Sequence, residues 1–180
     1  MTLSRIIIGW RGITGRLASG LAMALALFAV AGCTATNAGD SGNSEDEATV
    51  RAFYADVLSN PAETTEERYY ELFSPEIVSI PTPPGGEGAQ GMLNTVAFLG
   101  QVVPDLTWAP QEIIETGDGR FVVRGLATGT PVGPFFGVDP ATGESFEIMS
   151  IDIVTVEDGF ITHVYHLEDW TGAVAQLTAE

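Results

Sequence analysis

The segment 144–169 constrains the fold most strongly, because it has the pattern of a β-hairpin. Apolar residues occupy both parities of its first half, which is typical of a strand that is covered on both faces. Asp158–Gly159 then predicts a tight turn, since glycine supplies the positive φ that such turns need. The returning strand carries both histidines of the chain, His163 and His166.

Asp152 is the one charged residue in the middle of that apolar first strand. A buried carboxylate is costly in free energy unless it is paired or reaches water. The sequence therefore predicts a partner or a wet cavity at Asp152. A sheet that presents an aspartate and a histidine to one cavity is the main functional lead in this chain.

Whether Asp152 and His166 share a face depends on the turn. A two-residue turn places position 151 opposite His166. A three-residue loop with Gly159 in a bulge places position 150 opposite His166 instead, which puts Asp152 on the same side. The residues alone leave both registers open.

The charge balance argues against nucleic-acid binding. The chain has 180 residues, with 7 basic and 24 acidic side chains and a formal net charge of −17. All of the basic residues are arginines, and three of them precede Cys33. A surface of this sign repels nucleic acid and anionic membranes. The length favours one domain with additional segments.

Residues 1–32 are predicted to be a targeting segment, not part of the fold. They contain three arginines and no acidic residue, followed by an apolar run over 17–32 that is 16 residues long. A helix that spans a bilayer needs about 20 residues. The run ends in VAGC at 30–33, which resembles the lipobox of bacterial lipoproteins. An ordinary secretory signal with a chance cysteine is the alternative.

The resemblance to lipoproteins implies that Cys33 is lipidated and becomes the mature N-terminus. Several acyl chains anchor a protein stably to a membrane. Residues 33–43 are small and polar, which predicts a flexible tether before a folded domain at 44–180. The expected location is the cell envelope, outside the cytoplasm, and the outer membrane if the host has one, because Thr34 is not an aspartate.

The folded part is predicted to have helices first and strands afterwards. One helix is expected at 44–59 and starts with a Ser44–Glu47 capping box. A second, short helix follows a Thr64–Glu67 capping box and carries Tyr69, Tyr70, Leu72 and Phe73. A third helix is expected at 90–103. Strands are expected at 76–80, 106–116, 120–130 and in the hairpin, with a last helix at 170–177. This segregation indicates an α+β fold, in which a sheet of about four to six strands wraps on helices and leaves a cone with one open mouth.

Several short motifs, in this order, resemble the SnoaL-like polyketide cyclases or ester cyclases of the NTF2-like superfamily. They are PDLTW at 104–108, VVR at 122–124, ATGT at 127–130, GPFFG at 133–137, PATG at 140–143, ID at 151–152, DG at 158–159 and Asp169. The ordered set covers about residues 46–178.

The resemblance implies a cone-shaped α+β barrel with three N-terminal helices on a curved, mostly antiparallel sheet, a deep apolar pocket and a short C-terminal helix. Cyclases of this family close a ring by an intramolecular aldol step without metal or cofactor, with an aspartate on the last strand as general acid/base. By the family's spacing this position is His166, and the neighbouring polar positions are Ser150 and Asp152. The family pattern favours the register with the three-residue loop.

The candidate catalytic residues are therefore His166, Asp152 and Asp169. His166 and Asp152 could form a dyad in which the carboxylate orients the imidazole and raises its basicity, or they could be an ordinary half-buried histidine and a hydrated carboxylate. Asp169 precedes the last helix and is expected to be its N-cap. The pocket candidates are Ser150, Tyr54, Tyr69, Phe73 and Trp108, although aromatic residues at such spacings also occur in plain cores.

Two functions are compatible with these residues. One is a cofactor-independent cyclase or isomerase that acts on a small apolar molecule. The other is a lipid-anchored domain that binds a ligand or serves as a scaffold without chemistry. No motif for a metal or a phosphate loop is present in the sequence. A homodimer through the outer face of the sheet is also expected, from the apolar residues there and the family likeness.

Overall fold

The structure is a computed structural model that describes residues 40–138 and 142–179. The predicted targeting segment, the lipidation site at Cys33 and most of the predicted tether lie outside the described residues. Within the described part, no helix is both long enough and apolar enough to cross a membrane.

The helices lie where the apolar periodicity places them, with differences at their ends. They are α1 (Asp40–Ala52), its π-helical continuation η1 (Phe53–Leu58), α2 (Glu66–Leu72), α3 (Gly88–Val102) and α4 (Trp170–Leu177). The first helix thus ends in a wider turn that the sequence did not indicate. Phe53, Tyr54 and Val57 of η1 are buried in the core.

Neither predicted capping box starts its helix. Helix α1 begins at Asp40, so Ser44 lies inside it. Helix α2 is capped by Thr65, whose side chain accepts the N–H of Arg68 at 3.1 Å. The hydroxyl of Thr64 donates instead to the carbonyl of Asp56 at 3.0 Å. Thr64 is therefore engaged with η1 and is not available as a cap.

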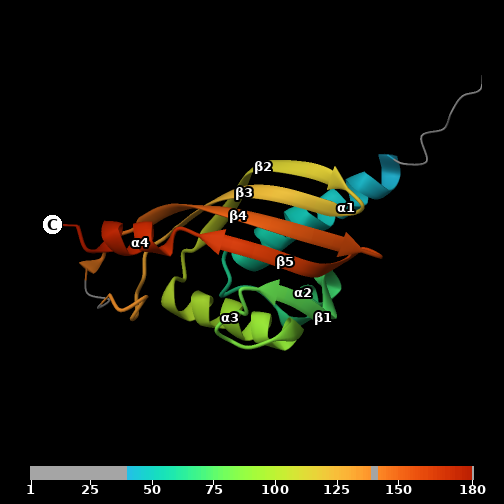
Figure 1. Ribbon diagram of the computed structural model, residues 1–180. Helices are drawn as coiled ribbons and strands as arrows, with labels where there is room; N and C mark the ends of the chain where they lie inside the picture. The colour runs from blue at the N-terminus through green and yellow to red at the C-terminus, as the bar shows by residue number, and fades with distance from the viewer. Residues whose placement is uncertain (1–39, 139–141, 180) are drawn as a thin grey trace, which may run out of the picture. The chain divides into compact units, whose positions relative to one another are not determined.

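The five strands form one mixed sheet. They are β1 (Phe73–Ile80), β2 (Thr107–Gly117), β3 (Arg120–Gly129), β4 (Phe146–Glu157) and β5 (Phe160–Glu168), and their order across the sheet is β1-β5-β4-β3-β2. Strand β1 runs parallel to β5, and the other neighbours are antiparallel. Figure 1 shows α1 behind the strands, α3 beside β1 and α4 at the end of the sheet. This arrangement confirms the predicted α+β class.

The hairpin has a register that neither predicted turn produces. Asp158 and Gly159 both have positive φ, and Glu157 pairs with Phe160 around a two-residue turn. A bulge at Thr162 then adds one residue to β5. A bulge shifts every later pair by one position. As a result, Asp152 faces His166 directly across the two strands.

The two faces of β4 differ in their cover. Ser150, Asp152 and Val154 are buried on the inner face, against the helices. On the outer face, Met149 is 51% exposed and Ile151 38% exposed. The expectation that this strand is covered on both faces is therefore not met within one chain. The sheet has an apolar outer face that is open to solvent.

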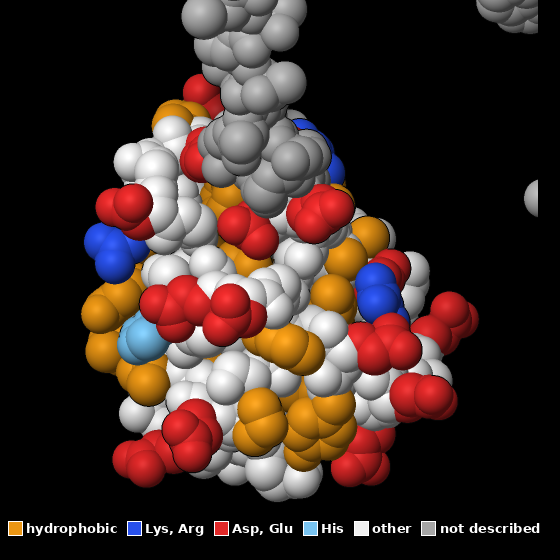
Figure 2. Space-filling model, turned by 90° about the vertical axis from the view of Figure 1, so that its right-hand side faces the viewer, with side chains coloured by type: hydrophobic (Ala, Val, Ile, Leu, Met, Phe, Trp, Pro, Cys, Tyr) orange, Lys and Arg blue, Asp and Glu red, His pale blue; other side chains and the backbone are white. Residues whose placement is uncertain are grey.

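The surface of the domain is strongly acidic. Figure 2 shows acidic side chains spread over one end of the molecule, with few basic ones among them. Arg124 lies on the outer face of β3 and forms an exposed ion pair with Glu112, with 3.5 Å between Nε and Oε2. Exposed pairs of this kind contribute little to stability.

Candidate functional site

An apolar cavity of about 240 Å³ lies between the inner face of the sheet, η1, α3 and the loop that follows β3. Aromatic rings and prolines dominate its wall. Three ionisable side chains also line it: Asp152 from β4, and His166 and Glu168 from β5. The remaining lining residues are Phe53, Leu58, Pro83, Pro84, Met92, Thr95, Val96, Phe98, Leu99, Trp108, Pro134, Phe135, Phe136, Val164 and Trp170.

Asp152 is the buried acid of this cavity, and it is only 3% exposed. The Tyr54 hydroxyl donates a hydrogen bond of 2.5 Å to its Oδ2. The Ser150 hydroxyl donates a second bond, of 3.1 Å, to the same oxygen. None of the hydrogen bonds within the described residues uses Oδ1. Two side chains of the protein thus hold Oδ2 of a carboxylate that lines the cavity.

The surroundings of Asp152 bring its titration close to neutral pH. Burial raises the pKa of the carboxyl from 3.8 to about 6, and the charge of Glu168 acts in the same direction. The hydrogen bonds from Tyr54 and Ser150 oppose this rise without cancelling it. Burial and the charge of Asp152 also raise the pKa of Tyr54 far above its usual range. Tyr54 therefore stays a hydrogen-bond donor at neutral pH.

His166 is held at both ring nitrogens. Nδ1 lies 2.8 Å from Oε1 of Glu168, and Nε2 lies 2.9 Å from the carbonyl oxygen of Pro81. A carbonyl oxygen and a carboxylate both accept hydrogen bonds, so these partners assign a proton to each nitrogen. Burial alone lowers the pKa of His166, but the bond and charge of Glu168 and the Pro81 carbonyl outweigh it and raise the pKa.

The predicted dyad is therefore not a hydrogen-bonded pair. Asp152 and His166 are cross-strand neighbours and both line the cavity, but the carboxylate that binds the imidazole is Glu168. Glu168 was not among the site residues predicted from the sequence. It lies two residues after His166, and strand alternation puts these two side chains on one face. Its second oxygen accepts the Trp170 indole N–H at 3.1 Å, so the Glu168 side chain, 11% exposed, is fully engaged.

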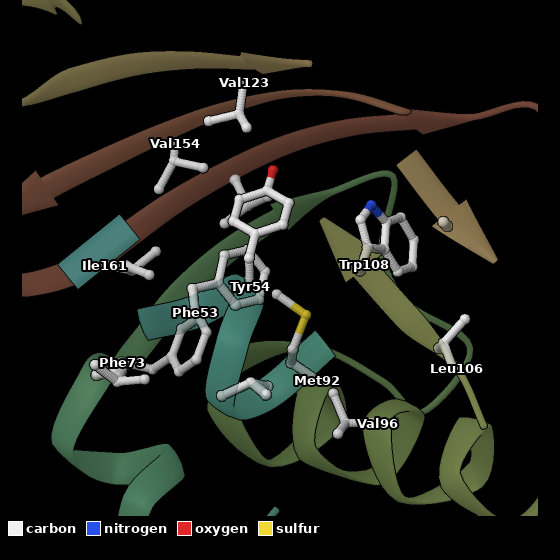
Figure 3. Close-up of a cluster of buried hydrophobic side chains, with 14 of the residues drawn as sticks. Phe53, Tyr54, Phe73, Met92, Val96, Leu106, Trp108, Val123, Val154 and Ile161 are labelled. Atoms are coloured by element: carbon white, nitrogen blue, oxygen red, sulfur yellow. The ribbon is translucent and has the colours of Figure 1, made fainter. Parts of the chain in front are cut away.

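The predicted aromatic pocket residues separate into two groups. Trp108 lines the cavity, and the Tyr54 hydroxyl reaches Asp152. Figure 3 shows the Tyr54 oxygen and the Trp108 nitrogen directed to the same side, towards the sheet. Tyr69 and Phe73 do not belong to the cavity lining and stack on each other in the core, with 4.4 Å between ring centroids.

The other two candidate residues, Ser150 and Asp169, lie in different surroundings. Ser150 is buried beside Asp152 and accepts a hydrogen bond of 2.9 Å from Nε1 of Trp108. Asp169 caps α4 and accepts the N–H of Gly172 at 2.8 Å, which confirms the N-cap prediction. Asp169 is not among the residues that line the cavity. Among the described residues, no group of three histidine, cysteine or acidic side chains is placed to hold a metal ion.

Comparison with known proteins agrees with this architecture. The family model described as SnoaL-like polyketide cyclase matches residues 48–177. No curated protein matches the chain. The similar solved structures include TsrD from Streptomyces laurentii, which is 27% identical with a TM-score of 0.62, over 78% of this chain and 98% of TsrD.

Two further structures are similar over nearly their whole length. IdmH, a proposed polyketide cyclase from Streptomyces antibioticus, is 29% identical with a TM-score of 0.62, over 73% of this chain and 97% of its own. A proposed SnoaL-like polyketide cyclase from Jannaschia sp. CCS1 is 22% identical with a TM-score of 0.65, over 77% and 94%. The last likeness concerns the fold alone. Together with the family match, these structures confirm the predicted resemblance to SnoaL-like polyketide cyclases.

Proposed function

The chain belongs to the SnoaL-like polyketide cyclase family, and on that premise we propose that it is a cofactor-independent enzyme that moves protons on a small apolar carbonyl compound. The reaction class is an aldol-type cyclisation or an isomerisation. A fold of this kind hosts many functions, so the proposal rests on the cavity and its ionisable groups.

The observation that carries the proposal is the carboxylate of Asp152. It lies in an apolar cavity, its Oδ2 is held by two donors, and burial raises its pKa to about 6. A general base works best when its pKa lies near the operating pH.

The proposed chemistry uses Asp152 on β4 and His166 on β5, which both line the cavity. Oδ1 of Asp152 takes a proton from the carbon next to a carbonyl, and the electron pair moves onto the carbonyl oxygen. The nearby His166 stabilises this enolate by its charge when its ring is protonated, a form that Glu168 and the Pro81 carbonyl favour. In a cyclisation, the enolate carbon attacks a second carbonyl, and the new alkoxide takes the proton back from Asp152. In an isomerisation, Asp152 returns the proton to another carbon.

Deuterium exchange tests the first step without knowledge of the natural substrate. Benzo-fused bicyclic ketones such as 2-tetralone are incubated with the protein in D₂O, and loss of their α-proton signals is followed by NMR. The wild type should accelerate exchange, and Asp152→Asn should lower that acceleration by about 10²–10⁴-fold. Asp158→Asn, in the hairpin turn, is the matched control because asparagine also tolerates positive φ. Equal acceleration by Asp152→Asn and the wild type would contradict the proposal.

A binding domain without chemistry is the second candidate, and the apolar wall of the cavity favours it. Trp108 and Trp170 line the cavity, so a bound ketone should change the indole fluorescence. Saturable quenching by ketones that the wild type binds, with no accelerated exchange of those same ketones, would favour this candidate over the enzyme.

We also propose that the protein is attached to a membrane through a lipidated Cys33, outside the cytoplasm. The support is the lipobox-like VAGC sequence at 30–33, after a short apolar run. Cys33→Ser should give a soluble or uncleaved protein after cell fractionation. A cleaved Cys33→Ser protein that still sediments with membranes would contradict the lipid anchor.

A homodimer through the outer face of the sheet is the third part of the proposal. Its support is the open apolar surface formed by Met149, Ile151, Tyr165 and Leu167. Monomeric soluble proteins seldom expose large contiguous apolar patches. Light scattering should give the mass of two chains for the wild type and of one chain for Ile151→Glu. A monomeric wild type at working concentration would contradict the dimer.

A further inference from the structure

Gly125 lies where two side chains meet across a strand. Trp108 is on β2 and Ser150 is on β4, and β3 runs between them. Gly125 is the β3 residue that pairs with Ser150, and it faces the inside of the sheet. The Trp108 indole passes over this position to reach Ser150, with 2.9 Å between Nε1 and Oγ.

A larger residue than glycine would close this passage. A Cβ atom at position 125 would lie 2.5 Å from Oγ of Ser150 and 2.9 Å from Nε1 of Trp108. Both distances are shorter than ordinary contacts with a Cβ atom, and both atoms belong to the hydrogen bond itself. The bond between Trp108 and Ser150 therefore depends on the missing side chain at Gly125.

The direction of the hydrogen bonds is set by the chemistry of the donors. An indole N–H can only donate, so Oγ of Ser150 accepts from Trp108. A hydroxyl has one proton, and an ionised carboxylate can only accept. The Ser150 hydroxyl therefore donates its proton to Oδ2 of Asp152, with 3.1 Å between Oγ and Oδ2. Trp108 thereby orients the hydroxyl that holds the carboxylate.

We propose that Gly125, Trp108 and Ser150 are positioning residues that hold Oδ2 of Asp152 and so present Oδ1 to the substrate. The inference rests on the proposed function, because it assigns these residues to the proton transfer by Asp152. Trp108 also lines the cavity, so one indole ring contacts the ligand on one side and orients the base through Ser150 on the other.

A role in positioning has a consequence that a role in folding alone lacks. The bond from Ser150 lowers the pKa of Asp152, against the effect of burial. Loss of that bond should raise the pKa of Asp152 further and move the acid limb of the exchange reaction to higher pH. For each unit of displacement, the rate well below the midpoint should fall about tenfold, and it should recover above the new midpoint.

The test compares four variants of the full chain. Ser150→Ala removes the hydroxyl, Ser150→Thr keeps it, and Gly125→Ala closes the passage without touching Asp152. Gly133→Ala is the matched control, because a Cβ atom there meets only Val102, at 3.8 Å. The titration of the Asp152 carboxyl carbon is followed by ¹³C NMR in the protein without ligand, with Asp152→Asn to assign the signal. The pH profile of 2-tetralone exchange is the second measurement.

We expect Ser150→Ala and Gly125→Ala to shift the Asp152 titration and the acid limb to higher pH, while Ser150→Thr and Gly133→Ala stay near the wild type. An unchanged Asp152 titration in Ser150→Ala would overturn the inference, even if exchange became slower. If Gly125→Ala does not fold, the alanine and threonine variants of Ser150 decide the outcome. If the wild type does not accelerate exchange but the titrations shift as expected, the proposed function fails while the hydrogen-bonded positioning of Asp152 stands.

Discussion

The Tyr54 hydroxyl donates a hydrogen bond of 2.5 Å to Oδ2 of Asp152, across 98 positions of the sequence. Tyr54 belongs to the π-helical turn η1, and Asp152 belongs to β4. The bond therefore ties the first helical segment to the centre of the sheet at the cavity. Hydrogen bonds to an ionised group are stronger than neutral ones, and π-helical turns are frequent at functional sites.

Tyr54→Phe removes this bond and keeps the ring. Because the partner is a buried carboxylate, the free energy of unfolding should fall by about 1.5–3 kcal/mol near pH 8, where Asp152 is ionised. The loss should be smaller near pH 5, where Asp152 is largely protonated and the bond joins two neutral groups. Urea denaturation at the two pH values measures the difference.

Tyr69→Phe is a matched control for that substitution. Tyr69 is also fully buried, but its hydroxyl has no hydrogen-bond partner among the described residues. Removal of an unsatisfied buried hydroxyl should leave stability unchanged or raise it slightly. An equal loss of stability in both variants would show that the hydrogen bond to Asp152 does not contribute to the free energy of unfolding.

Asp152 also makes the stability of the fold depend on pH. Its pKa is about 6 in the folded chain, above the ordinary value of 3.8, so the folded state binds the proton more tightly than the unfolded state. This contribution is fully present below pH 3.8 and is lost as the pH rises through about 6, a change of about 3 kcal/mol.

Asp152→Asn removes this pH-dependent contribution. The stability of the variant relative to the wild type should therefore increase by about 2–2.5 kcal/mol between pH 4 and pH 7, most of the full change. Groups that Asp152 does not influence are common to both proteins and cancel in the comparison, whereas the pKa of His166, which the charge of Asp152 helps to raise, also changes. Guanidinium denaturation of both proteins across this range measures the difference, and a constant difference would be incompatible with a raised pKa at Asp152.

Most of the fold could be predicted from the sequence, because helical stripes, strand alternation and turn residues are local signals. The register of the hairpin could not, because it depends on a bulge at Thr162. In hindsight the signal is the spacing of Ile161 and Val164, which both point into the core although they lie three positions apart. A regular strand would place them on opposite faces.

The site could be predicted only in part. Asp152 could be predicted because a single charged residue in an apolar strand is costly to bury unless it has a partner or reaches water. Strand alternation places Glu168 on the same face as His166, so Glu168 could have been predicted. A glutamate near the end of a strand is, however, typical of an exposed position. Gly125 gives no local signal, since its importance depends on an indole that arrives from another strand. Tyr69 has the same helical spacing as pocket residues, and only packing distinguishes the two cases.

The N-cap of α4 allows a test that separates stability from activity. Asp169→Ala removes the acceptor for the Gly172 N–H and should lower stability by about 1 kcal/mol. Asp169→Asn should cost little, because asparagine also caps helices well. Neither variant should alter ketone exchange, since Asp169 does not line the cavity. A large loss of exchange in folded Asp169→Asn would make Asp169 the acid/base and contradict the role of Asp152.

Glu168→Gln should weaken the preference of the His166 ring for its protonated form. The carboxylate accepts from both His166 and Trp170, whereas an amide has only one acceptor oxygen. If that oxygen keeps the bond to Trp170, the amide N–H₂ faces Nδ1, which can accept a hydrogen bond only after it loses its proton. Nε2 then keeps its proton and its bond to the Pro81 carbonyl.

The pKa of His166 should therefore fall in Glu168→Gln, and NMR titration of the ring protons measures it, with His163→Gln to assign the two histidines. The raised pKa of His166 in the wild type stabilises the fold below pH 6.5, and this contribution is lost as the pH rises through the folded pKa. The variant should lack that pH dependence.

Ketone exchange should also slow, because the enolate loses a nearby positive charge. The expected order of severity for exchange is Asp152→Asn, then His166→Ala, then Asp169→Asn, and an unchanged His166 titration in Glu168→Gln would show that Glu168 does not control the charge of the ring.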